Sequence, residues 1–195
     1  MRLKIVQAGD PVLRQATRQL TPTEISSPDI QRLIQDMRET MYDAPGVGLA
    51  APQVGIPIQL AVLEDRPESS RDLTPEQLAE RERRPTPFQV LINPTIVSQS
   101  QESVDFFEGC LSVAGFAALV RRARSVRIEH LDENGAARAL EAHGWHARVL
   151  QHEIDHLQGT LYVDRMNPRT LTSLENFARH WKSLPTSQVL TKVGS

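Results

Sequence analysis

The stretch that decides the fold is GWHARVLQHEIDHL, residues 144–157. Apolar and histidine side chains recur in it at steps of four, three and four residues, which puts them on one stripe of an α-helix. The stripe carries Trp145, Val149, His152 and His156. Because histidines four apart lie one turn apart and about 40° around the helix, both imidazoles can reach one metal ion. Gly159 is well placed to end the helix, so we expect a buried, metal-binding helix over residues 144–157.

Glu153 lies one residue after the first histidine, about 100° around the helix, where it can approach a metal-bound water without being a ligand. A hydrolytic metal site needs a third protein ligand, and the residues leave two candidates open. Glu175 lies 19 residues after His156, near the spacing of one class of zinc proteases. Cys110 is the other candidate, although a lone cysteine is more often a small buried apolar residue. A third histidine, as in another protease class, is excluded because Tyr162 holds that position.

The segments around this helix predict an antiparallel sheet and a second amphipathic helix. Ser27 and Pro28 are typical of a helix start, and apolar residues keep a 3.6-residue spacing from there to Met41. Strand-like runs lie at residues 58–63, 90–92, 95–97, 104–107, 118–120 and 126–130, with a hairpin turn at 132–135 and a last helical segment at 170–182. Because strands come first and the central helix comes late, we predict an α+β fold with antiparallel sheet packed on one buried helix.

Residues 64–87 form a polar stretch that four prolines interrupt. We expect a surface insertion with a short helix over 75–82 rather than a domain boundary. Its arginine-rich run at 81–84 lies among acidic residues, and we expect a solvated face there rather than a binding patch.

The composition is that of a single globular domain. The chain has 195 residues, 39% of them hydrophobic and 24% charged, with a formal net charge of −2. This charge gives no electrostatic reason to expect nucleic acid or an anionic membrane as a partner. One cysteine cannot form an internal disulfide. Because no window approaches the roughly 18 apolar residues of a membrane span and no signal peptide is recognisable, we expect a cytoplasmic protein.

Three segments in order resemble the signature motifs of peptide deformylases. They are GVGLAAPQ at 46–53, EGCLS at 108–112 and QHEIDHL at 151–157. A glycine-rich loop alone is common, but the three segments together, at compatible distances, are highly specific. The similarity extends over roughly residues 1–170, and we expect 171–195 to be a C-terminal helical extension and tail. Residues 144–148 and 161–166 resemble the branch that includes the mitochondrial-type enzymes, without their long N-terminal targeting extension.

The resemblance implies a peptide deformylase-like α+β fold, with antiparallel sheets packed around a central metal-binding helix. It also implies a hydrolase that removes the formyl group from the N-terminal methionine of newly synthesised proteins and releases formate. The metal ligands that it implies are Cys110, His152 and His156. The catalytic groups that it implies are Glu153, the Gln53 side-chain amide and the Leu111 backbone N–H. The residues that it implies for the methionine pocket are Val47, Gly48, Trp145, Arg148 and Val149.

The resemblance favours Fe(II) as the metal, with Ni, Co or Zn able to substitute. The implied partners are N-formyl-methionyl nascent peptides and the ribosome. Two departures concern the substrate side: Ala114 stands where many bacterial members have proline, and His143 stands where a small polar residue is expected. The rival hypotheses are a protease that uses Glu175 as its third metal ligand, and a descendant of the family that binds metal or ribosome without turnover.

Overall fold

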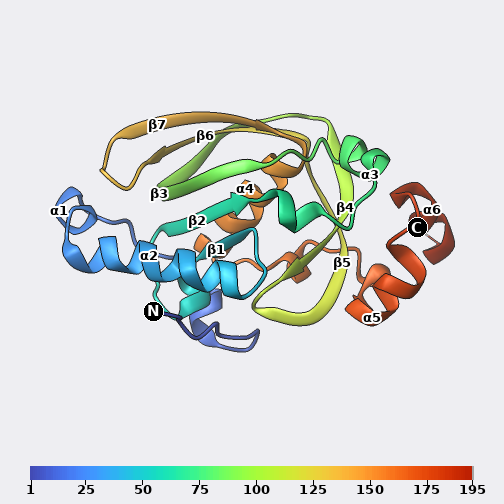
Figure 1. Ribbon diagram of the computed structural model, residues 1–195, viewed down its shortest axis with the longest axis horizontal. Helices are drawn as coiled ribbons and strands as arrows, with labels where there is room; N and C mark the ends of the chain where they lie inside the picture. Colours follow the sequence, from blue (N-terminus) through green and yellow to red (C-terminus); the bar gives the residue numbers. More distant parts are fainter. Residues whose placement is uncertain (195) are drawn as a thin grey trace.

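Helix α4 (Gly144–Leu157) lies at the centre of the molecule, between two antiparallel sheets (Figure 1). The computed structural model describes residues 1–194. The helix begins and ends where its sequence predicts, and Gly159, at a φ of +73°, follows it in the left-handed conformation that ends helices. Most residues of α4 are buried. The predicted α+β fold, with antiparallel sheets around a central helix that carries His152 and His156, is therefore confirmed.

The larger sheet has the strand order β1-β2-β3-β6-β7 within the described residues, and each neighbouring pair is antiparallel. Its strands are β1 (Gly48–Ala50), β2 (Leu60–Asp65), β3 (Thr86–Gln99), β6 (Ser125–Leu131) and β7 (Ala137–His143). The smaller sheet has the order β4-β5-β8 and consists of β4 (Ser103–Cys110), β5 (Val113–Ala123) and β8 (Thr172–Ser173). The structure thus adds β1, β7 and β8 to the predicted runs.

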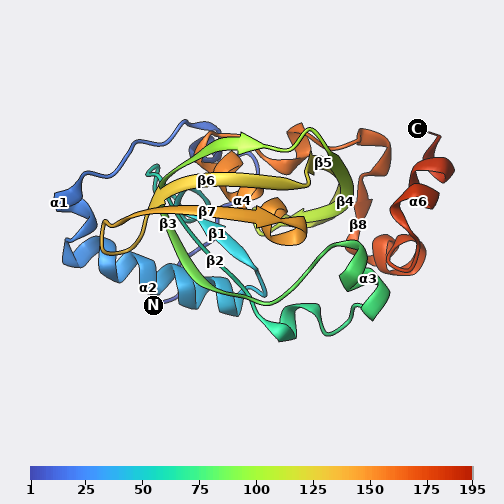
Figure 2. The same cartoon turned by 90° about the horizontal axis from the view of Figure 1, so that it is seen from above.

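Strand β2 shows how the larger sheet packs between two helices. Its Leu60 and Val62 pack in one core with helix α2 (Pro28–Asp43), while Ala61 and Leu63 pack in a second core with α4. Figure 2 shows the sheet from above, with α2 on one side and α4 on the other. Because helices cover both faces, the strand is apolar at successive positions rather than alternating. Each fully buried leucine or valine of this kind stabilises the fold by about 1.5–3 kcal/mol.

Helix α2 begins as predicted, with the Ser27 side chain accepting a hydrogen bond from the Ile30 amide. A single turn, α1 (Pro22–Ile25), precedes it. Within residues 1–194, none of the helices has the length and apolar content that a membrane span requires.

The polar stretch at 64–87 does contain the expected short helix, α3 (Pro75–Glu80), but it is more than a surface insertion. Its Arg83 forms a bidentate ion pair with Asp65, and both side chains are less than 10% exposed. The Arg81 carbonyl accepts a hydrogen bond from the Trp145 amide at 2.8 Å, which satisfies a free amide in the first turn of α4. The expectation that the arginine run at 81–84 is solvated is therefore wrong for Arg83, because the segment packs against the central helix.

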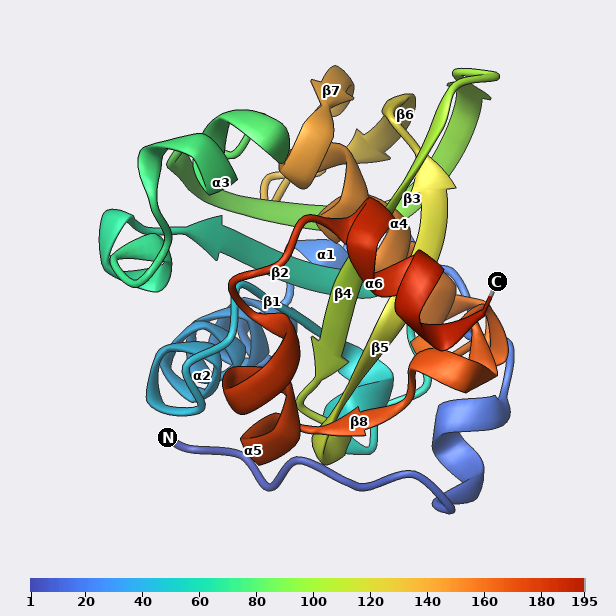
Figure 3. The ribbon, with the colours of Figure 1, turned by 90° about the vertical axis from the view of Figure 1, so that its right-hand side faces the viewer.

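The end of the chain differs from the single helix predicted at 170–182. Thr172 and Ser173 pair with β5 as strand β8, so the helical part begins later. It consists of α5 (Leu174–Asn176), a π-helical turn at Phe177–Trp181, and α6 (Thr186–Val193). Figure 3 shows this segment lying in front of the smaller sheet, and Figure 1 shows it at the opposite end of the molecule from α1.

Candidate metal centre

The three predicted ligands meet at one point. One ligand atom from each of Cys110, His152 and His156 lies within 4.8 Å of the other two. The sulfur comes from the end of β4 and the imidazoles from one face of α4, two elements that are remote in sequence. The Cys110 Sγ atom is 3.3 Å from Nε2 of His156. This converging set of one sulfur and two nitrogens is the kind that holds a divalent transition metal.

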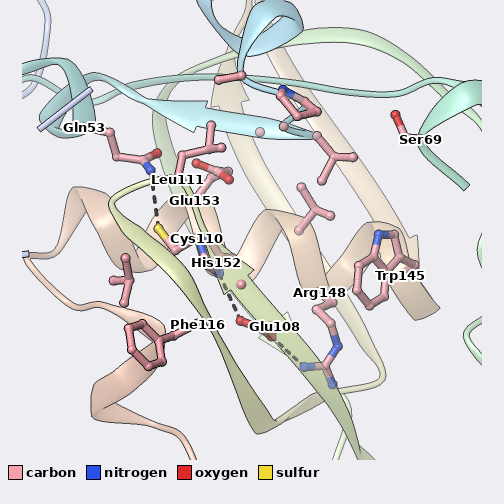
Figure 4. A pocket seen from close by; sticks show the side chains of 18 of the residues that line it. Gln53, Ser69, Glu108, Cys110, Leu111, Phe116, Trp145, Arg148, His152 and Glu153 are labelled. Atoms are coloured by element: carbon pink, nitrogen blue, oxygen red, sulfur yellow. Dashed lines mark hydrogen bonds and ion pairs between the residues drawn. The ribbon is translucent and has the colours of Figure 1, made fainter. Parts of the chain in front are cut away.

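Glu108 fixes the orientation of the first histidine. Its carboxylate lies 3.0 Å from Nδ1 of His152, so this nitrogen donates the hydrogen bond and Nε2 is left to face Cys110 (Figure 4). Burial alone would lower the pKa of His152, but hydrogen bonds with Cys110 and Glu108 raise it well above its ordinary value.

A buried charge network holds Glu108 in turn. Its two oxygens accept hydrogen bonds from Arg122 at 2.6 and 2.9 Å and from Arg148 at 2.6 Å. Arg122 also donates to Asp155 on α4, which pairs with Arg165 as well. Burial tends to raise the pKa of Glu108, but the bonds from Arg122 and His152 outweigh it and hold that pKa well below its usual range. The carboxylate is thus ionised and locked in place.

His156 provides a neutral ligand. Burial, followed by the nearby charge of His152, lowers the pKa of His156 well below its ordinary value. The neutral imidazole is the form that binds a metal ion. Within residues 1–194, its buried Nδ1 atom has no hydrogen-bond partner. A neutral imidazole, a second imidazole oriented by a carboxylate and a cysteine sulfur together fit a bound divalent metal ion.

Glu153 lies beside the cluster and outside the ligand set. Burial raises its pKa to about 7, and its Oε2 atom is buried without a hydrogen-bond partner among the described residues. A carboxyl group with such a pKa can both take and give a proton near neutral pH. The space that it occupies exists because residue 48 is glycine: a Cβ atom there would lie 2.2 Å from Oε1 of Glu153.

Gln53 and Leu111 also reach this point. The Gln53 side-chain Nε2 lies 3.5 Å from the sulfur of Cys110 and 3.3 Å from the Ser112 hydroxyl, while its Oε1 accepts a hydrogen bond from the Ala50 amide. Leu111 follows the cysteine in the tight turn between β4 and β5. Both residues line the cavity described next.

A cavity of about 420 Å³ leads to the cluster. Its wall includes the residues predicted for the methionine pocket, which are Val47, Gly48, Trp145, Arg148 and Val149. The charged end of Arg148 is committed elsewhere: it bonds Glu108 and the carbonyls of Val104 and Val120. Arg148 therefore offers this cavity no free guanidinium.

The rival third ligand is not in the cluster. Glu175 lies on α5, its side chain is 78% exposed, and it pairs with Arg179 on the same segment. The geometry groups Cys110 with the two histidines instead.

Several contributors to this site were not predicted. Glu108 stands in the same short segment as Cys110, and with Phe106 it occupies alternate, inward-facing positions of β4, so the two-residue period was the available signal. Arg122 and Asp155 carry no comparable signal, because only the fold brings them to Glu108. The same is true of Ser69 and Arg83, which reach the cavity from the segment at 64–87.

A buried cluster of one cysteine and two histidines, with an adjacent carboxyl group at the base of a cavity, defines a metal-dependent hydrolase. The family model for polypeptide deformylase matches residues 2–171. The chain therefore belongs to the peptide deformylase family, whose members remove the N-formyl group from the N-terminal methionine of new proteins. The predicted resemblance is thereby confirmed, and so is the prediction of an enzyme.

Individual relatives agree with this. A chloroplastic peptide deformylase 1A of Solanum lycopersicum is 49% identical over 172 residues, which cover 88% of this chain and 62% of that protein. The mitochondrial peptide deformylase of Homo sapiens is 42% identical over 170 residues, 87% of this chain and 70% of that one. A crystal structure of a class I type b peptide deformylase from Acinetobacter baumannii, bound to Met-Ala-Ser, has a TM-score of 0.77 at 31% identity and covers 85% of this chain and 99% of that one. Organelle enzymes thus stand among the relatives, as the predicted branch requires.

Proposed function

We propose that this chain hydrolyses the N-formyl group of peptides that begin with formyl-methionine, releasing formate and a free amino terminus. The observation that carries the proposal is the convergence of Cys110, His152 and His156 beside the buried carboxyl group of Glu153, at the base of a cavity. A binding role alone needs no general base, so the buried carboxyl group argues for turnover.

The substrate backbone has a place between two sheets. Strand β1 ends the strand order of the larger sheet and β4 ends that of the smaller one, within the described residues. The cavity is lined by Val47 and Gly48 at the first strand and by Glu108 and Gly109 on the second. An extended peptide entering between them meets backbone hydrogen-bonding groups on both sides, as in strand addition.

Three groups of the chain act on the formyl amide. Glu153 takes the proton of the attacking water and delivers it to the leaving amine, a role worth about 10²–10⁴ in rate. The amide of Gln53 and the backbone N–H of Leu111 donate hydrogen bonds to the oxygen of the formyl group as negative charge develops on it. When bound, the metal ion supplies Lewis acidity, which lowers the pKa of water towards about 7.

The methionine side chain occupies the apolar part of the cavity. Trp145 and Val149 project from α4 into it and Val47 faces them from the segment before β1. Arg148 contributes to this wall through its aliphatic stem, because its guanidinium is bound to Glu108.

We propose Fe(II) as the metal in the cell, with Ni, Co or Zn able to replace it, because a sulfur and two imidazoles accept all of these ions. The catalytic domain comprises residues 1–170, with 171–195 as an extension. We also propose a cytoplasmic location: the relatives include bacterial proteins, such as peptide deformylase 3 of Streptomyces avermitilis at 47% identity, beside chloroplastic and mitochondrial ones. Nascent chains as substrates make the ribosome the expected partner, which co-sedimentation with translating ribosomes tests.

Formate release from an N-formyl-methionyl tripeptide tests the proposal, using protein purified without oxygen and loaded with Fe(II) or Ni(II). We expect rapid release of formate from the formylated peptide and no release of acetate from the acetylated peptide. If folded, metal-loaded protein releases no formate, the proposed activity is contradicted and the hypothesis of a binding protein without turnover is favoured.

A further inference from the structure

A short segment after helix α4 contacts one face of that helix at two points. It consists of a single helical turn, Tyr162–Asp164, and of Arg165, whose amide donates a hydrogen bond to the Tyr162 carbonyl. The buried ring of Tyr162 stacks on the imidazole of His152, with centroids 6.4 Å apart and 19° between the ring planes. Arg165 forms an ion pair with Asp155. Because residues three apart on a helix are neighbours on its surface, the segment braces the helix beside a predicted metal ligand.

The ion pair of Arg165 with Asp155 joins the protein surface to the interior. The side chain of Arg165 is 47% exposed, whereas that of Asp155 is 8% exposed. Nε and a terminal nitrogen of the guanidinium donate hydrogen bonds to the two carboxylate oxygens, at 2.7 and 2.8 Å. A bidentate contact of this kind fixes the orientation of the carboxylate as well as its position.

From Asp155 the charged contacts continue to the predicted metal ligand. Its Oδ2 atom also accepts a hydrogen bond from Arg122 at 2.7 Å. The buried guanidinium of Arg122 makes a second bidentate contact, with Glu108. Glu108 in turn accepts the hydrogen bond from Nδ1 of His152. Since each group in this series is planar, a rotation of one of them strains its bonds to the next, and the orientation of His152 depends on a surface side chain that does not touch it.

We propose that Arg165 is a positioning residue for the metal centre and that it acts through Asp155 and the buried charges behind it. The fork of two donors is the important property, because a point charge would leave the carboxylate free to rotate. The fold should tolerate the loss of Arg165, since Asp155 keeps Arg122 as a buried counterion. This inference rests on the proposed function, because it requires His152 to bind the metal ion.

Titration of metal-free protein with Co(II), followed by the visible absorption of the bound ion, tests the proposal. Loss of a direct partner of a metal-binding histidine costs about 10–100-fold in affinity, so we expect about tenfold weaker Co(II) binding in Arg165→Met, which acts from further away. The absorption spectrum of bound Co(II) should also shift, which a loss of stability alone would not cause. Arg165→Lys keeps the charge but not the fork, and we expect its binding to be at least about threefold weaker than that of the wild type. Thermal melting establishes that each variant is folded.

The matched control is Arg14→Met. Arg14 is also 47% exposed and pairs with Asp164, the neighbour of Arg165, but that acid is 39% exposed and lies outside the buried charge network. Its loss should leave the affinity for Co(II) within about twofold of the wild-type value.

Three results would overturn the positioning role while leaving deformylation intact. They are wild-type affinity and spectrum in folded Arg165→Met, full affinity in Arg165→Lys, and equal weakening in Arg14→Met. Wild-type protein that binds no Co(II) would instead overturn the proposed metal centre, and with it the proposed function.

Discussion

The base and the rim of the same cavity are built in opposite ways. At the base, the side chains of Glu108 and Arg122 are each less than 5% exposed and are held by several charged partners. At the rim, Phe116 and Leu174 are about half exposed and their positions depend on backbone pairing. The difference teaches that the reacting groups are fixed by side-chain chemistry, which demands particular residue types. The apolar side chains at the mouth of the cavity are positioned by topology, which many residue types can serve.

Removing the sulfur ligand should have the largest effect at the base. We expect Cys110→Ala to weaken metal binding by more than about 100-fold, since changes merely next to a ligand already cost 10–100-fold, and to lower formate release to background. Anaerobic metal titration and metal analysis measure this. Glu175→Ala is the control, because that exposed side chain should leave metal content unchanged. Metal loss in the control but not in Cys110→Ala would restore the protease hypothesis.

Removing the general base should spare the metal. We expect Glu153→Gln, which keeps the shape that fills the space beside Gly48, to lower kcat by about 10²–10⁴-fold with full metal occupancy. Steady-state kinetics on metal-loaded protein measures the change. Wild-type turnover in this variant would exclude Glu153 from proton transfer.

Neutralising the carboxylate behind the ligands should act on the metal and on the fold together. In Glu108→Gln, Arg122 and Arg148 lose a buried counterion, so we expect a loss of about 3–5 kcal/mol in the free energy of unfolding. The affinity for metal should fall by about 10–100-fold because His152 loses its orienting acceptor. Denaturant unfolding and metal titration check the two effects.

The same strand offers a control for this variant. Asp105→Asn removes an acid that pairs with Arg121, whose side chain is 69% exposed, so we expect a loss of less than about 1 kcal/mol. Equal losses for the two variants would contradict the contrast between a locked base and a solvated surface.

Removing the charge of Arg83, which lines the cavity from the segment at 64–87, should lower the stability of the fold but leave metal binding almost unchanged. Arg83→Met leaves Asp65 buried without its partner and removes the guanidinium that lies 4.9 Å from the centre of the Trp145 ring. We expect a loss of about 3 kcal/mol in unfolding free energy, the lower end for a broken buried pair, with unchanged metal content. Arg84→Met, at an exposed neighbouring position, should change neither. A loss of metal in Arg83→Met would show that rim and base are one unit.

From the sequence we could predict the helices whose ends are marked by local signals, namely apolar periodicity and capping residues. The period of α4 gave both its ends, and the caps of α2 gave its start. The predicted hairpin turn at 132–135 implied a strand after it, but not its bounds: β7 is an edge strand with mostly exposed residues and so lacks an apolar alternation. Strand β8 was assigned to a helix because its two residues are determined by pairing with β5, which local pattern cannot reveal.

The candidate site divides in the same manner. Two short segments, 108–112 and 151–157, contain the predicted ligands and Glu153, and the structure brings the three predicted ligands to one point. Arg122 and Leu174 could not be predicted, because nothing local marks an arginine that will be buried or a leucine that will stand at a cavity mouth.

The glycine at position 48 has a consequence for how this site can change over generations. A methyl group there and the carboxyl group of Glu153 would claim the same volume, although the two residues stand 105 positions apart and belong to different elements. Position 48 can therefore not vary alone: a larger residue there becomes tolerable only if the acid at 153 withdraws, and the proton-transfer role proposed for that acid would then be lost. The choice of residue at position 48 is thus set by a side chain that the linear sequence places far away, and glycine is the residue that leaves Glu153 its present position.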